Sequence, residues 1–453
     1  MKLFAQRAYC QDGWSRNVSV TVKDGHIQSI TPNTTAETGD YQVDSLLPAL
    51  ANLHSHSFQR AMAGMTEYRA QGRESFWTWR SLMYRFLDRL TPEHIQAFAA
   101  QTFMEMQMAG YASVGEFHYV HHQAGGQHYA DPAELSLRVI EAAKDTGIGL
   151  THLPVLYTYG GADGRALEGG QLRFSNSVDT FSDIVARSNT AIAGAHADTC
   201  VGIAPHSLRA TSPADLADVL ARHSDCPVHI HIAEQVKEVE EIKSTLGARP
   251  VEWLLDNAQV DAAWCLIHAT HMTAGETADM AKSGAVAGLC PITEANLGDG
   301  AFNGSEYLAA QGTFGIGSDS NVNISLTEEL RTLEYSQRLK HQERNVLVDG
   351  TGSTGRALYT GAAKGGAQAI GRNSGEIQIG ALADLVAIDS QDATLCALSD
   401  DQLLDGLVFA AKDSVVTDVW SAGRHQVQSR HHIHADVITG NYKAAIRDLL
   451  KDL

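Results

Sequence analysis

Between residues 46 and 318 the chain alternates short apolar runs with longer segments of helical periodicity, and this alternation restricts the possible folds. Eight runs have the length and composition of buried strands, at 46–53, 113–117, 149–156, 201–205, 227–232, 264–268, 285–290 and 313–318. Thr91-Pro92-Glu93 and Ser212-Pro213-Ala214 are helix-start signals ahead of two of the intervening segments. Eight strand-then-helix units predict an α/β fold, a (β/α)8 TIM-like barrel, although the periodicity alone also fits a doubly wound sheet.

Both ends of the chain carry strand patterns of a different kind. Residues 18–22 and 26–30 alternate apolar and polar side chains around an Asp-Gly pair, which predicts a β-hairpin. After two helical segments, strand character returns at 377–388, 415–423 and 425–428. Two or three strands rarely stand alone in water. We therefore expect a small β-sandwich domain built from both ends, a barrel and a C-terminal helix, at 1–45 with 372–436, 46–371 and 437–453.

Composition favours a globular enzyme and argues against several classes of partner. The 453 residues are 44% hydrophobic and 19% charged, which suits one large domain plus an accessory piece. The net charge of -19 argues against nucleic acid, because phosphate binding needs clustered Lys and Arg. No apolar run approaches the ~20 residues of a membrane span, and the first residues form no secretory apolar region. The six cysteines form no CxxC pair and are expected to be reduced, which favours the cytoplasm.

Four of the predicted strands close with side chains that bind metals. In a barrel of this type the active site forms where the strands end. Each side chain alone is explained as well by a buried histidine or a helix-capping aspartate. Their joint occurrence favours a Zn²⁺ site with an open position for water. The side chains concerned are His54 and His56 after strand 1, His231 on strand 5, His268 on strand 6 and Asp319 after strand 8.

This pattern resembles the amidohydrolase superfamily. The segment Gly-Ala-Leu-Ala-Asp-Leu-Val at 380–386 is similar to the β-sandwich that accompanies the barrel in that superfamily. Strand 4 offers no lysine that could bridge two metals, so the resemblance is to the one-metal branch, and His231 followed by Glu234 is similar to the HxxE arrangement of its deaminases.

Longer motifs narrow the resemblance to members that act on N-formimino-L-glutamate. These motifs include His-Ser-His-Ser-Phe-Gln-Arg-Ala-Met-Ala-Gly at 54–64 and Thr-Glu-Ala-Asn-Leu-Gly-Asp-Gly at 293–300. Further matching stretches lie at 76–80, 116–122, 204–209, 229–235, 267–271 and 315–320. The pattern departs at 160–164 and at Asn321-Val-Asn323, both in expected loops, where the fit of the substrate is affected. The implied reaction is hydrolysis to N-formyl-L-glutamate and ammonia, in a homodimer.

The resemblance also implies roles for individual residues. One Zn²⁺ per subunit would lower the pKa of a bound water toward ~7, and the same ligands would accept Fe²⁺, cobalt or nickel. His268 and Asp319 would take the proton of this water, and Glu234 would carry a proton to the departing nitrogen. The implied metal ligands are His54, His56, His231 and Asp319.

The two carboxylates of such a substrate require cationic anchors. Arg209 is the first candidate and Arg80, in Trp77-Thr-Trp79-Arg80, is the second, because a guanidinium binds a carboxylate bidentately. Without the resemblance, Arg80 is equally well explained as a surface arginine stacked on tryptophan. Hydrogen bonds to the rest of the substrate are implied for Gln59, Tyr119 and His206.

Two other functions remain open. A zinc aminohydrolase of a ring such as guanine or cytosine would use amide and aromatic contacts, so two arginines count against it. A non-catalytic relative would be expected to lose metal ligands.

Several histidines lie outside this scheme. His118, His121 and His122 follow strand 2, where zinc chemistry does not need them, and His229 is expected to pack one layer below His231. The Arg-His-His-Ile-His segment at 430–434 is expected to be a solvated loop.

Overall fold

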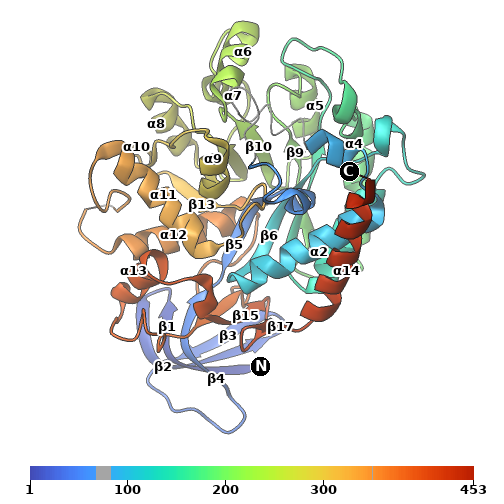
Figure 1. The fold of residues 1–453 in the computed structure, drawn as a ribbon. Helices are drawn as coiled ribbons and strands as arrows, with labels where there is room; N and C mark the ends of the chain where they lie inside the picture. Colours follow the sequence, from blue (N-terminus) through green and yellow to red (C-terminus); the bar gives the residue numbers. More distant parts are fainter. Residues whose placement is uncertain (68–82, 349, 453) are drawn as a thin grey trace.

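The computed structural model of the chain describes residues 1–67, 83–348 and 350–452. A ring of parallel strands lies at the centre with helices around it, and a mostly antiparallel sheet covers one end of this ring (Figure 1). None of the helices among the described residues combines the length and the apolar character needed to cross a bilayer.

The central strands close into a barrel. The strands are β5 (Leu50–Ser55), β6 (Tyr111–His118), β7 (Gly149–Leu156), β8 (Cys200–Val201), β9 (Ala204–Pro205), β10 (Val228–Ile232), β11 (Trp264–His268), β12 (Val286–Leu289) and β13 (Thr313–Ile316). Strands β5 to β9 form one parallel half and β10 to β13 the other. Parallel bridges Ser55–Asp319 and Ile203–Val228 join the halves at both seams. The barrel predicted from the alternating pattern is therefore confirmed.

Helices follow the strands along the chain. They are η1 (Ser57–Met62), α2 (Pro92–Met108), α3 (Glu134–Thr146), α4 (Val178–Ile192), α5 (Pro213–Arg222), α6 (Val236–Leu246), α7 (Pro250–Asn257), α8 (Ala274–Ser283), α9 (Pro291–Leu297), α10 (Gly304–Ala309), α11 (Leu326–His341), α12 (Thr354–Ala369), α13 (Asp401–Phe409) and α14 (Ala435–Leu449). Thr91 and Ser212 cap α2 and α5 with their side chains, and a proline follows each cap, which confirms both predicted helix starts.

Two of the predicted strands differ in the structure. The run 46–53 is not a single strand, because β4 (Tyr41–Pro48) belongs to the antiparallel sheet and β5 begins only at Leu50. Both segments are buried, so their shared apolar character concealed the boundary. The fourth predicted strand, 201–205, is divided into β8 and β9.

Both ends of the chain form one eight-stranded sheet. Its other strands are β1 (Lys2–Cys10), β2 (Gly13–Lys23), β3 (His26–Thr31), β14 (Leu385–Ile388), β15 (Val416–Ser421), β16 (Arg424–Gln428) and β17 (His431–His432). The order is β17-β16-β15-β14-β4-β1-β2-β3, and β2 and β3 form the predicted hairpin. The sheet curls over its own apolar core, because Ala383 N–H donates to Gly25 O at 2.8 Å and a bridge joins His26 to Leu382. The two layers expected of a sandwich are thus parts of one continuous sheet.

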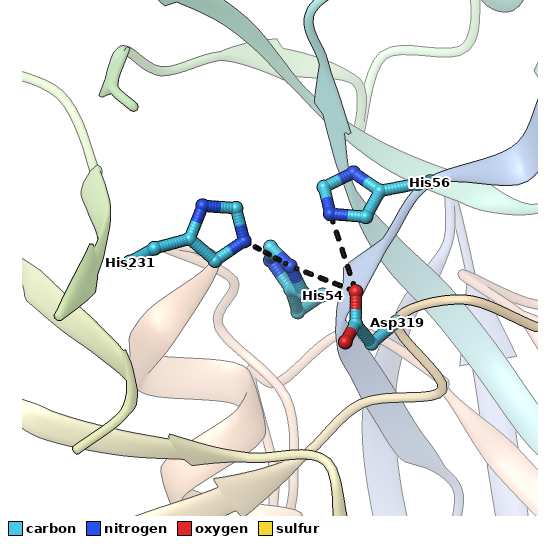
Figure 2. A group of neighbouring side chains, drawn as sticks. All are labelled: His54, His56, His231 and Asp319. Atoms are coloured by element: carbon cyan, nitrogen blue, oxygen red, sulfur yellow. Dashed lines mark hydrogen bonds and ion pairs between the residues drawn. The ribbon is translucent and has the colours of Figure 1, made fainter. Parts of the chain in front are cut away.

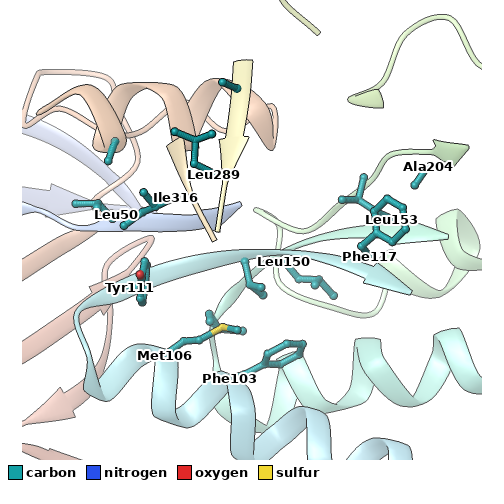
Figure 3. Packing of buried hydrophobic residues seen from close by; sticks show 14 of the residues in the cluster. Leu50, Phe103, Met106, Tyr111, Phe117, Leu150, Leu153, Ala204, Leu289 and Ile316 are labelled. Atoms are coloured by element: carbon teal, nitrogen blue, oxygen red, sulfur yellow. The ribbon is translucent and has the colours of Figure 1, made fainter. Parts of the chain in front are cut away.

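Apolar packing fixes the barrel inside its helices, and an ionic cluster ties the curled sheet to it. Phe103 and Met106 of α2 lie against the β6–β7 face, beside Leu150 (Figure 3). Buried Arg372 contacts Asp198 at 2.7 Å. It also contacts Asp384, the residue directly before β14. Such contacts leave the opposite, carboxyl ends of the barrel strands free to form a site.

Candidate metal centre and active site

Backbone pairing at one barrel seam brings the first three candidate ligands together. His56 N–H donates to Asp319 O at 2.9 Å, and Asp319 N–H donates to His54 O at 3.0 Å. Asp319 has a φ of 45°, an unusual conformation for a residue other than glycine. Ala233 and His268, at the ends of β10 and β11, also have positive φ. Such strained backbone is concentrated at functional sites, because surrounding contacts must stabilise it.

Three imidazoles and one carboxylate converge where these strands end (Figure 2). The Nε2 atoms of His54 and His231 lie 3.1 Å apart. Asp319 Oδ1 lies 3.2 Å from His56 Nε2 and 3.5 Å from His54 Nε2. All four ligand atoms lie within 4.8 Å of one another and all four side chains are buried. The group fits one metal ion, and its nitrogen and oxygen donors suit zinc.

Hydrogen bonds orient two of the imidazoles for this role. His56 Nδ1 lies 2.9 Å from Phe117 O, and His231 Nδ1 lies 3.2 Å from His206 O. A carbonyl oxygen only accepts, so each Nδ1 carries the proton and each Nε2 presents a lone pair.

The protonation states also match those of metal ligands. Burial lowers the pKa of His54 to about 3 and holds the pKa of His231 well below its ordinary value. Burial alone would raise the pKa of Asp319, but the adjacent His54 and His56 side chains hold it well below its usual range. Neutral imidazoles and an ionised carboxylate are the forms that bind a metal.

A buried polar chain supports the metal residues from below. Asn52 donates to Ser318 Oγ at 2.7 Å, and Ser318 Oγ donates to Asn321 Oδ1 at 2.6 Å. Asn321 Nδ2 donates in turn to Ser55 Oγ at 3.1 Å and to Asp319 O at 3.0 Å. The sequence placed Asn321 in a loop that affects substrate fit, whereas its side chain is fully buried under the metal residues.

His268 lies beside the candidate metal ligands among carboxylates. Its Nε2 is 3.9 Å from Asp319 Oδ2, and its Nδ1 is 3.2 Å from Glu294 Oε1. Burial alone would lower the pKa of His268, but Glu234, Glu294 and Asp319 raise it to about 10. Glu294 was inside a quoted motif without an assigned role. Its position four residues after Cys290, whose N–H it accepts at 2.9 Å, explains how it is held beside His268.

One cavity contains the candidate acid–base and substrate residues. It is lined by His56, His231, Asp319, His268, Glu234, Gln59, Tyr119, His206 and Arg209. Gln59 donates to Tyr119 Oη at 2.6 Å, and the rings of His206 and Tyr157 lie 4.5 Å apart. Burial raises the pKa of Glu234, which favours the protonated form of its carboxyl group. Arg80 lies outside the described residues.

Other lining residues were not found from the sequence. These six residues carry no motif chemistry, although Thr293, Leu297 and Ser320 stood inside quoted stretches. They are Met83, Tyr157, Phe174, Thr293, Leu297 and Ser320.

The remaining histidines pack elsewhere. His229 Nε2 contacts Ala369 O at 2.8 Å below the site, and His121 Nε2 contacts Val155 O at 2.9 Å. The prediction of a solvated loop at 430–434 is wrong for His432. This residue is buried in β17 with Nε2 3.0 Å from Gln107 Oε1, because β17 packs against α2.

Comparison with known proteins gives a family for this fold and site. The model of the amidohydrolase family matches residues 45–425. A second model, described as the N-terminal domain of formimidoylglutamate deiminase HutF, matches residues 2–43.

Individual relatives agree with these models. The formimidoylglutamate deiminase of Pseudomonas aeruginosa is 49% identical over 434 residues, 95% of each chain. A crystal structure of an amidohydrolase from Brucella melitensis superposes with a TM-score of 0.96 at 46% identity, covering 99% of both chains. An adenosine deaminase from Xanthomonas campestris with bound zinc shares the fold, with a TM-score of 0.82 at 21% identity over 99% of this chain and 98% of that one. This chain belongs to the amidohydrolase family and, within it, to the formimidoylglutamate deiminases.

Proposed function

We propose that the chain hydrolyses N-formimino-L-glutamate to N-formyl-L-glutamate and ammonia, a step in histidine degradation. The observation that carries the proposal is the shared cavity, in which Glu234, His268 and Arg209 lie beside the four candidate metal ligands. The relative from Pseudomonas aeruginosa, whose name gives this activity, supports it over nearly the whole chain.

The metal proposed for the site is zinc, bound by His54, His56, His231 and Asp319. Zinc in such a site activates a water molecule as a nucleophile at neutral pH. The donor set supports zinc but also suits Fe²⁺ and other divalent ions, so metal analysis of the purified protein must decide.

His268 and Asp319 are proposed to take the proton that the attacking water loses. The carboxylates of Glu234, Glu294 and Asp319 stabilise a protonated imidazole at His268, which is the form it reaches on accepting a proton. Its contact with Glu294 also fixes the orientation of the ring. A divalent cation bound beside Asp319 would offset the charge of these carboxylates and lower the pKa of His268, so that a neutral imidazole is available to accept the proton.

Glu234 is proposed to deliver a proton to the nitrogen that departs. Attack at the formimino carbon gives a tetrahedral centre with two nitrogens and one oxygen. The bond to the terminal nitrogen then breaks, and this nitrogen leaves as ammonia once it is protonated. The raised pKa of the half-buried Glu234 supports a proton donor at this position.

Arg209 is proposed to bind a substrate carboxylate, with Arg80 as the second anchor. Arg209 is 8% exposed and lines the same cavity as Glu234, so its charge faces the proposed substrate site. Gln59, Tyr119 and His206 are proposed to hydrogen-bond to the substrate between its two ends. A planar guanidinium in such a place favours an anionic ligand over a neutral ring.

We propose that the enzyme works in the cytoplasm and forms a homodimer. All six cysteines are free thiols, which supports a reducing compartment. The dimer rests on the resemblance to the family alone. Sedimentation of the purified enzyme tests the dimer.

Ammonia release from N-formimino-L-glutamate is the direct test of the reaction. The purified enzyme is assayed as isolated, after chelation and after restored Zn²⁺, with guanine and cytosine as parallel substrates. We expect release from the formimino compound that is lost on chelation and regained with zinc. Ammonia release only from guanine or cytosine would contradict the proposed substrate and would indicate a nucleobase instead.

A further inference from the structure

The segment between β10 and α6 carries Glu234, and a second buried glutamate bonds to its backbone. Glu238 Oε1 accepts the N–H of Ala233 at 3.0 Å, and Glu238 Oε2 accepts the N–H of Glu234 at 3.0 Å. Glu238 is 6% exposed and lies in the first turn of α6. Both oxygens of one carboxylate are therefore used to fix the backbone of the proposed proton donor.

This contact differs from an ordinary helix cap. In a capping box the third helical residue bonds to the N–H of the N-cap residue, which for α6 is Gln235. Glu238 instead bonds to the two residues before Gln235, where Ala233 has a φ of 51°. A bend of this kind costs free energy and needs contacts that stabilise it. Glu238 thus stabilises the turn that directs Glu234 into the cavity.

Charge links Glu238 to both ends of the cavity. Burial and the Glu234 carboxylate together raise the pKa of Glu238 to about 7, against the opposing effects of the Arg209 guanidinium and of the two backbone N–H groups. The charged groups that act on Glu234 from the neighbouring elements are His268, Asp319, Arg209 and Asp299. In its ionised form, which the two backbone N–H groups favour, Glu238 places a negative charge close to the proposed proton donor and to the proposed carboxylate anchor.

We propose that Glu238 is a positioning residue that orients Glu234 and adjusts its proton affinity through both carboxylate oxygens and its charge. The proposal rests on the proposed function for the role of Glu234. It does not depend on which substrate the enzyme uses, because both contacts exist within the chain itself.

Two substitutions separate the geometry of Glu238 from its charge. Glu238→Gln retains the length but loses the charge and one acceptor, and Glu238→Asp retains the charge but is too short to keep both bonds. We expect kcat for ammonia release to fall on the order of 10- to 100-fold in each, because a misdirected proton donor reacts slowly. KM should change little, since neither variant removes Arg209.

The matched control is Glu276→Gln. Glu276 is equally buried and also accepts backbone N–H groups at a helix start, from Thr273 at 2.8 Å. It lies at the start of α8 and does not line the cavity. Because Glu276 also pairs with Arg249 at 2.7 Å, this variant reports what the loss of a buried helix-start carboxylate and its ion pair does to folding, away from the cavity. Thermal unfolding of all variants shows how much native protein each contains.

The deciding measurement is the titration of the Glu234 carboxyl group in the zinc-loaded enzyme by isotope-edited infrared spectroscopy. Its band is assigned by its loss in Glu234→Gln. We expect a lower pKa of Glu234 in Glu238→Gln, because a neighbouring negative charge is gone, and a nearly unchanged pKa in Glu238→Asp and Glu276→Gln. An unchanged pKa in Glu238→Gln, or an equal shift in the control, would overturn the proposal. No ammonia from the formimino substrate would overturn only the proposed function, since this titration uses no substrate.

Discussion

His54 and His231 come from opposite halves of the barrel, and their Nε2 atoms lie only 3.1 Å apart. Burial favours the neutral form of both rings, and the Nδ1 proton of His231 is fixed by His206 O. Two buried nitrogens at this separation need a cation or a proton between them. The Asp319 carboxylate beside them favours a cation.

Removal of the metal should abolish activity and reduce stability. A ligand that binds only the folded state stabilises it by about 2.7 kcal/mol when present at 100 times its Kd. We expect chelation to lower the midpoint of thermal unfolding and zinc to restore it, measured by calorimetry with metal analysis. His231→Gln should lose the metal, while His229→Gln, on the same strand but bonded to Ala369 O, should keep it. Equal metal content in both variants would contradict the assignment.

Asn321→Ala should weaken metal binding although Asn321 is not a ligand. The substitution removes the bonds to Ser55 Oγ and Asp319 O, which orient the ends of β5 and β13. Groups that orient ligands typically change metal affinity by about 10- to 100-fold. Competition with a chromogenic chelator measures the affinity. Asn323→Ala, at an exposed position of the same loop, is the control and should bind zinc as the wild type does.

Glu234→Gln should lower kcat while the fold and the metal content stay intact. An amide cannot donate a carboxyl proton, and positioned acids contribute about 10²- to 10⁴-fold. Steady-state kinetics and metal analysis of the same sample measure both quantities. Glu240→Gln, exposed on α6, should leave kcat unchanged. Full activity in Glu234→Gln would exclude this residue as the proton donor.

Arg209→Lys should raise KM more than it lowers kcat. A lysine keeps the charge but loses the bidentate contact to a carboxylate, and a bond of this kind contributes about 1.5–3 kcal/mol. The expected rise in KM is therefore about 10- to 100-fold, measured with N-formimino-L-glutamate. Arg222→Lys, on the exposed face of α5, is the matched control. An unchanged KM in Arg209→Lys would mean that another cation binds the carboxylate.

Buried histidines should make the protein less stable in mild acid. Burial lowers the pKa of His152 to about 3, and the pKa values of His118 and His121 also lie well below their ordinary value. These groups bind protons more tightly in the unfolded chain, so the free energy of unfolding falls as the pH drops below about 6.5. Each such histidine contributes a slope of up to about 1.4 kcal/mol per pH unit.

Denaturant unfolding between pH 5 and 8 measures this slope. His152→Leu removes a ring whose two nitrogens have no hydrogen-bond partner among the described residues, so the slope should decrease. His431→Gln changes an exposed histidine of β17 and should leave the slope as it is. The same slope in His152→Leu as in the wild type would show that other groups dominate.

Local pattern accounts for much of the fold. Burial on both sides makes parallel strands continuously apolar, and a proline directly after Ser212 or Thr91 favours a helix start, so short segments carry both signals. The pattern does not reveal that 46–53 is divided between β4 and β5, because the two halves belong to different sheets and both are buried. The burial of His432 could not be predicted either, since it depends on a contact with Gln107 of α2, over 300 residues away in the sequence.

Strand alternation and strand termini are local properties, so the sequence alone predicts the strand-then-helix units of a barrel and the residue types at the strand ends. The approach of the Nε2 atoms of His54 and His231 to 3.1 Å follows from the tertiary structure alone, since their strands are brought together by the closure of the barrel. The same holds for Asn321 beneath Asp319 and for Glu294 beside His268. These contacts depend on distances between chain segments that no periodicity in the sequence records.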